Sequence, residues 1–237
     1  MDLVHMLEQG ARKLGISIPF GAYDSFRIYL SMLEETNKTT NLTAIEASED
    51  IVLLHFLDSL ALLKVAEFEN ANVIDIGSGG GFPGVPLKIV DQTIRLTLLD
   101  ATAKKIVFLS DLCTKLGIEA DMLHARAEEA AHDEHLRDRF DIVVSRAVAH
   151  LDVLCELCLP FVRVGGVFLA MKSADYEAEL HEAIGAISLL GAEISQTHKY
   201  ELPDTDIVRS IIRISKTAAT PNEYPRRFSK IKKHPLK

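Results

Sequence analysis

The sequence predicts an α/β fold: a doubly wound, Rossmann-like and mostly parallel sheet that follows an N-terminal helical extension. Up to about residue 70, apolar residues recur at the three- and four-residue spacing of amphipathic helices, whereas β-type and helix-type runs alternate after it. A glycine-rich segment, DIGSGGGFPG at 75–84, joins the first β-type run to the next helix-type run. The last two β-type runs, 193–202 and 206–216, are joined by a short Pro-Asp-Thr turn, which predicts a closing antiparallel hairpin.

Length and composition predict one large domain or one domain with an appendage. The chain has 237 residues, 48% of them hydrophobic, which is enough for a substantial core. We divide it into a helical region at 1–70, a sheet domain at 71–216 and a tail at 217–237. The longest apolar-rich run, 51–68, contains charged residues and is not expected to span a membrane. Three cysteines, an odd number, and a start without a signal-peptide pattern predict a cytoplasmic protein.

Charge is distributed unevenly along the chain. The net charge is −8, yet residues 209–237 hold nine Lys and Arg and one acidic residue, which makes this segment +8. The remainder then holds 17 basic and 33 acidic residues, or −16. A basic tail on an acidic body is either a solvated terminus or an arm that binds phosphates.

The elements follow in order from the hydrophobic spacing. The predicted N-terminal helices cover 3–14, 26–33 and a segment for which Ser48 is the N-cap. The polar stretch 36–43 is rich in Asn and Thr and predicts a loop. The predicted parallel strands are 71–76, 94–100, 120–124, 140–145 and 166–171, with helices near 84–90, 103–116, 151–159 and 175–190. The closing hairpin is the arrangement of S-adenosylmethionine-dependent methyltransferases, whereas a dinucleotide-binding fold more often adds a sixth parallel strand.

The glycine-rich segment predicts a cofactor loop. Gly77 and Gly79 let the backbone turn sharply and approach a ligand closely. Asp75 ends the preceding strand, where a carboxylate can face a cationic or hydroxyl-rich ligand. Phe82 and Pro83 are bulky where a pyrophosphate would need the helix N-terminus. These features favour S-adenosylmethionine, and a nicotinamide dinucleotide is the alternative.

Three further strand ends carry candidate residues, because ligands bind at the carboxyl edge of such sheets. Asp100, 25 residues after Asp75, can accept hydrogen bonds from ribose hydroxyls, or it caps the next helix. Ala127 and Glu128 follow the third strand, where they can contact an adenine edge, or they form an exposed acidic loop. Arg146 follows the fourth strand and borders both cofactor and substrate, or it belongs to a structural ion pair.

Some methyltransferase motifs are missing. No Asp-Pro-Pro-Tyr type motif follows the fourth strand, and no Pro-Cys dipeptide supplies a nucleophile for a pyrimidine. Cys155 and Cys158 lie one turn apart on an apolar helix without a second pair of ligands nearby. We interpret them as core residues and expect no metal site.

Segments along nearly the whole chain resemble one family. They are NKTTNLT (37–43), HFLDSL (55–60), DIGSGGGFPG (75–84), ARAE (125–128), SRAVA (145–149) and a YPR tail (224–226) that ends in Pro235-Leu236. Together they are similar to the RsmG (GidB) methyltransferases of bacterial small-subunit ribosomal RNA. The resemblance implies methyl transfer to guanine N7 in the 530 loop of 16S rRNA, either naked or within the small ribosomal subunit particle. Where the family usually has Lys-Gly after strand five and Gly and Pro in the tail, this chain has Lys172-Ser173, Ser229 and Ile231.

The resemblance also implies the site residues. The implied cofactor contacts are Gly77, Phe82, Ala127, Glu128 and Arg146. Guanine N7 has a free lone pair, so that it can attack the sulfonium methyl without a general base. We expect RNA contacts at Asn37, Asn41, Lys172, Arg226, Arg227, Lys230, Lys232 and Lys233. An NAD(P)-dependent oxidoreductase and a non-catalytic RNA-binding module are the alternative functions.

Overall fold

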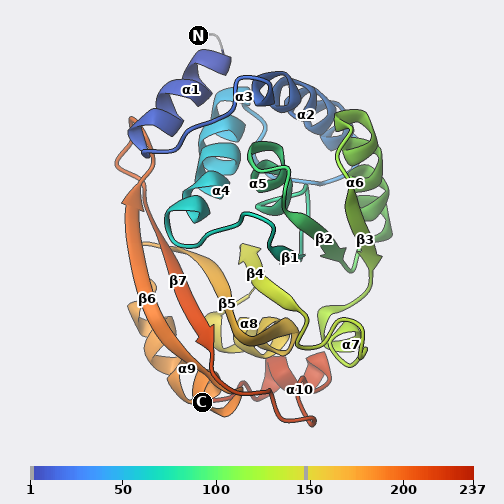
Figure 1. Ribbon diagram of the computed structural model, residues 1–237, viewed down its shortest axis with the longest axis vertical. Coiled ribbons are helices and arrows are strands. Elements are labelled where there is room, and N and C mark those ends of the chain that lie inside the picture. The colour runs from blue at the N-terminus through green and yellow to red at the C-terminus, as the bar shows by residue number, and fades with distance from the viewer. Residues whose placement is uncertain (1–2, 147–148) are drawn as a thin grey trace.

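A computed structural model describes residues 3–146 and 149–237. Ala147 and Val148, which belong to the segment 145–149 noted above, lie outside the described residues. The described chain forms a twisted sheet with helices on both faces (Figure 1). None of the helices in these ranges combines the length and the apolar composition needed to cross a membrane.

The described residues form a seven-stranded sheet in the order β3-β2-β1-β4-β5-β7-β6. The strands are β1 (Asn72–Ile76), β2 (Arg95–Asp100), β3 (Ala120–His124), β4 (Phe140–Arg146), β5 (Val162–Ser173), β6 (Ala192–Glu201) and β7 (Val208–Lys216). The pairings among β1 to β5 are parallel, and β7 is antiparallel to both of its neighbours. The predicted fold class, with a parallel sheet closed by a hairpin, is therefore confirmed.

The helices match the predicted alternation with a few additions. The prediction of Ser48 as an N-cap is wrong, because Ser48 is the first helical residue and Ala47 is the N-cap. They are α1 (Leu3–Lys13), α2 (Ala22–Asn37), α3 (Ser48–Ile51), α4 (Asp58–Leu60), α5 (Gly84–Val90), α6 (Ala103–Leu116), α7 (Ala127–Ala130), α8 (Leu151–Cys158), α9 (Glu177–Leu189) and α10 (Phe228–Lys233). A π-helical turn, η1 (Val52–Leu57), joins α3 to α4, and 3-10 turns η2 (Ala61–Lys64) and η3 (Leu159–Phe161) follow α4 and α8. Gly117 ends α6 in the left-handed conformation, as predicted. The sequence did not predict α7 and α10.

The period-two alternation of the strands distributes their side chains between two cores. Val73 packs with α1 to α6 on one face, whereas its neighbour Ile74 packs with α8 to α10 on the other. Figure 1 shows the N-terminal helices and the C-terminal helices on opposite sides of the sheet. By the same alternation, Arg146 lies on the N-terminal helices' side with Ile142 and Val144, and Lys172 lies on the opposite side with Phe168 and Ala170.

Candidate functional site

The glycine loop turns over the end of β2. The N–H groups of Gly77 and Ser78 donate to the carbonyl of Leu99, at 2.8 and 3.0 Å. Gly77 and Gly79 have φ angles of 75° and 58°, which L-residues with a side chain rarely adopt. A Cβ on Gly79 would contact nothing closer than the Gly77 carbonyl oxygen at 3.8 Å, so open space lies next to this turn.

Two carboxylates, those of Asp75 and Asp100, accept hydrogen bonds from backbone N–H groups of the glycine-rich segment. Asp75 is fully buried, and its Oδ2 accepts a hydrogen bond from the Gly84 N–H at 2.8 Å. Within the described part of the chain, its Oδ1 accepts none. Burial raises the pKa of Asp75 to about 7, although Gly84 and Arg146 act in the opposite direction. Asp100 accepts hydrogen bonds from the N–H groups of Gly79 (3.0 Å) and Thr102 (2.8 Å).

The structure brings the candidate residues of the first three strands to the same edge. Asp100 pairs with His124 at the ends of β2 and β3, and Ala127 and Glu128 follow immediately as the first turn of α7. Because Thr102 is the N-cap residue of α6, Asp100 both supports the loop and shapes the helix start. The resulting site combines tightly turned backbone with two buried carboxyl groups, which suits a cationic ligand that carries hydroxyls.

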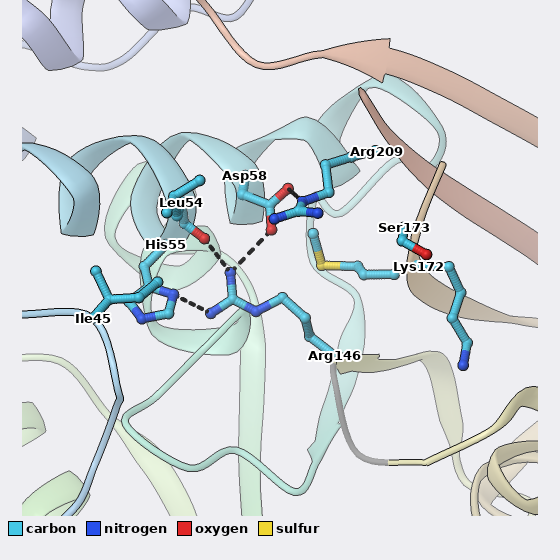
Figure 2. Close-up of a pocket in the computed structure, with 9 residues that line it drawn as sticks. Ile45, Leu54, His55, Asp58, Arg146, Lys172, Ser173 and Arg209 are labelled. Carbon is cyan, nitrogen blue, oxygen red and sulfur yellow. Dashed lines mark hydrogen bonds and ion pairs between the residues drawn. The ribbon is translucent and has the colours of Figure 1, made fainter. Parts of the chain in front are cut away.

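Arg146 connects this loop to the N-terminal helices. Its Nη1 donates to the Leu54 carbonyl at 3.0 Å and to Asp58 Oδ2 at 3.1 Å. Its Nη2 lies 2.8 Å from Nδ1 of His55 (Figure 2). The guanidinium carbon also lies 5.1 Å from the centre of the Phe82 ring, a cation–π distance. Arg146 therefore contacts both the glycine loop and the helical segment at 48–64.

His55 and Phe82 stack against one another, with ring centres 4.4 Å apart. The other ring nitrogen of His55, Nε2, lies 2.7 Å from the hydroxyl of Thr43. Burial and the charge of Arg146 lower the pKa of His55 to about 3, so that the imidazole is neutral. Tyr29 also stacks on Phe82, with ring centres 5.2 Å apart, and its hydroxyl donates to the Gly80 carbonyl at 2.6 Å.

Beside Arg146 lies a pocket of about 340 Å³ between the helix at 48–64 and the ends of β4 and β5. Its lining residues are Ile45, Leu54, His55, Asp58, Arg146, Met171, Lys172, Ser173 and Arg209. Asp58 is almost completely buried, and its Oδ1 accepts a hydrogen bond from the Tyr200 hydroxyl at 2.7 Å. The Arg209 Nε lies 3.9 Å from the same oxygen. Figure 2 shows Asp58, His55 and Arg146 meeting at one side of this pocket.

The sequence interpretation did not assign a role to His55, Asp58, Tyr200 or Arg209. A signal for the first two was present, because both are polar residues in an otherwise apolar helical run. Their partners lie far along the chain, because Arg146 is 88 positions and Tyr200 is 142 positions after Asp58. No local pattern could have joined them.

The residues expected to bind RNA are distributed over several surfaces. Asn37 organises the 37–43 loop, because its Oδ1 accepts from the N–H groups of Leu42 (2.9 Å) and Thr43 (3.1 Å). Asn41 is exposed at the tip of that loop. The ammonium of Lys172 points away from the Arg146–Asp58 pair in Figure 2 and binds the Ala149 carbonyl (2.7 Å) and Glu179 (2.6 Å).

The basic tail packs against the sheet domain. Arg226 forms a bidentate ion pair with the fully buried Glu156 of α8, with Nε–Oε1 and Nη2–Oε2 distances of 2.9 and 2.7 Å. Buried Ile231 holds α10 against the second core. The other tail cations expected to bind RNA, which are Arg227, Lys230, Lys232 and Lys233, are exposed. Arg226 is thus used inside the fold, and the other four face solvent.

Comparison with known proteins gives a family. Residues 22–208 match the family profile GidB, described as rRNA small subunit methyltransferase G. The chain belongs to this family. A relative from Alkaliphilus oremlandii, named Ribosomal RNA small subunit methyltransferase G, is 43% identical over all of both chains. One of the same name from Clostridium tetani is 41% identical, also over all of both chains. The family predicted from the sequence motifs is confirmed.

Solved structures similar to this GidB-family chain support its fold. One is TrmN from Thermus thermophilus, with a TM-score of 0.53 and 17% identity over 68% of this chain and 48% of that chain. Another was reported for the conversion of a disulfide bond into a thioacetal group during echinomycin biosynthesis, with a TM-score of 0.53 and 18% identity over 67% of this chain and 81% of that chain. At these identities the likeness concerns the fold alone.

Proposed function

We propose that this GidB-family protein transfers the methyl group of S-adenosylmethionine to N7 of a guanine in the 530 loop of 16S rRNA. The observation that carries the proposal is the position of Arg146, which contacts the glycine loop through Phe82 and lines the adjacent pocket. Arg146 would then contact both a cofactor bound at the loop and a base bound in the pocket. Such an enzyme acts in the cytoplasm, where bacterial ribosomes assemble.

The residues at the loop fit S-adenosylmethionine. Because Gly79 has no Cβ, the open space beside it can accommodate a ligand. Asp100, which holds the Gly79 N–H, would also accept hydrogen bonds from ribose hydroxyls, and the charged form of the buried Asp75 carboxyl would favour a cation. Ala127 and Glu128 would contact the adenine from the start of α7. When bound, the cofactor supplies a methyl group on a cationic sulfur.

The protein's contribution to the chemistry is alignment. With S-adenosylmethionine bound, the N7 lone pair would attack the methyl carbon as the C–S bond breaks with its electrons going to sulfur, and the positive charge would move to the base. No proton leaves N7, so the site needs no general base, and in-line placement of the reacting atoms at roughly 3–3.5 Å provides the acceleration. We assign this orientation to Arg146, because its guanidinium is held by Leu54, His55 and Asp58.

The target guanine must be unpaired or flipped, since the A-form major groove is too narrow to expose N7 to side chains. We propose that the exposed cations of α10 and the tip of the 37–43 loop bind the surrounding RNA. Lys172 belongs to this set only if RNA displaces its ion pair with Glu179. Both naked rRNA and the small-subunit particle offer such a loop.

The test is mapping of N7-methylguanine in 16S rRNA from cells with and without the protein. Complementation with wild type should restore the modification, whereas Arg146→Ala should not. Arg163→Ala is the matched control. Arg163 is about half exposed and pairs with Asp141 at the amino ends of β5 and β4, whereas Arg146 lies at the carboxyl end of β4. In vitro, naked rRNA and small-subunit particles are compared as methyl acceptors. If NAD(P) but not S-adenosylmethionine raised the melting temperature, the proposal would be wrong.

A further inference from the structure

The 340 Å³ pocket beside Arg146 has the properties of a base-binding site. Ile45, Leu54 and Met171 supply apolar wall, which suits the faces of a purine ring. Asp58, at 3% exposure, is the acidic side chain of the lining and supplies a carboxylate, beside the cations Arg146 and Arg209, that can accept hydrogen bonds. A neutral, flat group with hydrogen-bond donors on its edge matches both features.

Asp58 has hydrogen-bonding capacity that its protein partners do not use. Tyr200 donates to Oδ1 at 2.7 Å and Arg146 donates to Oδ2 at 3.1 Å, whereas Arg209 Nε, at 3.9 Å from Oδ1, forms an ion pair beyond hydrogen-bond distance. An ionised carboxylate can accept about four hydrogen bonds, so each oxygen retains a free acceptor site after these contacts. The two contacts also hold the carboxylate in a fixed orientation, and Arg146 links it to the edge of the sheet where the cofactor loop lies.

We propose that Asp58 binds the Watson–Crick edge of the target guanine through its N1–H and N2–H donors, which makes it the residue that selects guanine. This inference rests on the proposed function. Guanine presents these two donors side by side, and a carboxylate can accept both. Adenine has an acceptor at N1 and no 2-amino group, so that the carboxylate would repel it. The pocket thereby distinguishes the two purines, both of which offer an N7 lone pair.

The same contact contributes to the rate of transfer. When N7 takes the methyl group, the base becomes cationic, and its N1–H and N2–H bonds become stronger donors. Their hydrogen bonds to the buried Asp58 carboxylate therefore strengthen as the transition state forms. An interaction that is stronger in the transition state than in the ground state accelerates the chemical step.

A purely structural role for Asp58 makes a different prediction. If Asp58 only positioned Arg146, its replacement would slow methyl transfer to every base equally. If Asp58 binds the guanine edge, two changes must weaken the same interaction. One is removal of the 2-amino group from the substrate, and the other is replacement of the Asp58 carboxylate. A substrate carrying inosine at the target position, which retains N7 and N1–H but lacks the 2-amino group, separates the two.

The experiment compares kcat/KM for RNA with guanine and with inosine at the target position, using wild type, Asp58→Asn and Tyr200→Phe. We expect wild type to prefer guanine by roughly 10- to 100-fold, the effect of one hydrogen bond to a charged group. Asp58→Asn should be slower on both substrates and lose most of this preference. Tyr200→Phe leaves the carboxylate in place, so it should be slower while it keeps the preference.

Two results would overturn the inference. One is equal use of guanine and inosine by wild type, a comparison that needs no variant and is unaffected if Asp58→Asn fails to fold. The other is an unchanged guanine preference in a folded Asp58→Asn protein, which would leave Asp58 as a positioning residue. If wild type methylated neither RNA, the proposed function itself would be wrong.

Discussion

Arg146 Nη2 donates a hydrogen bond to Nδ1 of His55 over 2.8 Å. A guanidinium has only donors, so His55 must be the acceptor and its imidazole must be neutral. The ring proton is therefore on Nε2, which donates to the hydroxyl of Thr43 at 2.7 Å. In this tautomer, His55 thus links the 37–43 loop to Arg146 at the end of β4 through hydrogen bonds.

This arrangement predicts that stability depends on the protonation of His55. Its folded pKa is lowered to about 3, below the ordinary value of 6.5, so the unfolded chain binds the proton more readily. The contribution of neutral His55 to the free energy of unfolding is complete above pH 6.5 and is lost as the pH falls towards 3. His55→Asn keeps an acceptor for Arg146 but does not titrate. Between pH 7 and pH 5, urea unfolding should show wild type losing about 2 kcal/mol relative to this variant. Parallel pH profiles would contradict the prediction.

Asp75 predicts a proton coupling to the cofactor. Its pKa of about 7 leaves the buried carboxyl partly protonated at neutral pH. A cationic ligand on the loop favours the charged form, so binding of S-adenosylmethionine at pH 7 should release up to about half a proton. Calorimetry in two buffers of different ionisation enthalpy measures this release. Asp75→Asn should bind without buffer dependence, and an equal release from this variant would assign the proton to another group.

Gly79 tests the position of the cofactor loop against a matched glycine. Gly79 and Gly117 have φ angles of 58° and 65°, and neither has an atom within 3.4 Å of a built Cβ. Valine at either position costs about 1–2 kcal/mol of backbone strain. Only Gly79→Val should also abolish S-adenosylmethionine binding, because only its side chain enters the ligand's space. Isothermal titration on both folded variants checks this, and full binding by Gly79→Val would place the cofactor elsewhere.

The parallel sheet, its closing hairpin and the glycine loop were predictable because their signals are local. Strand alternation, the glycine segment and the closing hairpin each depend on neighbouring residues. The pocket was not predictable in this way, since Asp58 joins residues 88 and 142 positions away in the chain. The helix α10 was missed because six residues with one buried side chain, Ile231, give no periodic pattern.

The basic tail illustrates a limit of charge counting. The segment carries +8, but a count does not show which cation has a buried partner. Glu156 lies in an apolar helix and takes up Arg226, so this arginine stabilises the fold. Arg226→Ala should destabilise the protein by about 3–5 kcal/mol, because it leaves the Glu156 carboxylate buried and unpaired. Thermal or urea unfolding measures the loss, and a change under 1 kcal/mol would mean that water replaces the arginine.

The exposed cations of the tail should behave in the opposite way. Arg227, Lys230 and Lys233 face solvent on α10 and beside it. Their combined replacement by alanine should leave stability and S-adenosylmethionine affinity unchanged while it weakens RNA binding. If all three contact phosphates, the slope of log affinity against log salt should flatten by about 2, at roughly 0.7 per contact for single-stranded RNA. Binding measured across a salt series checks this value. An unchanged slope would show that this surface is merely solvated, and RNA contacts should then be sought at the 37–43 loop, where Asn41 is exposed.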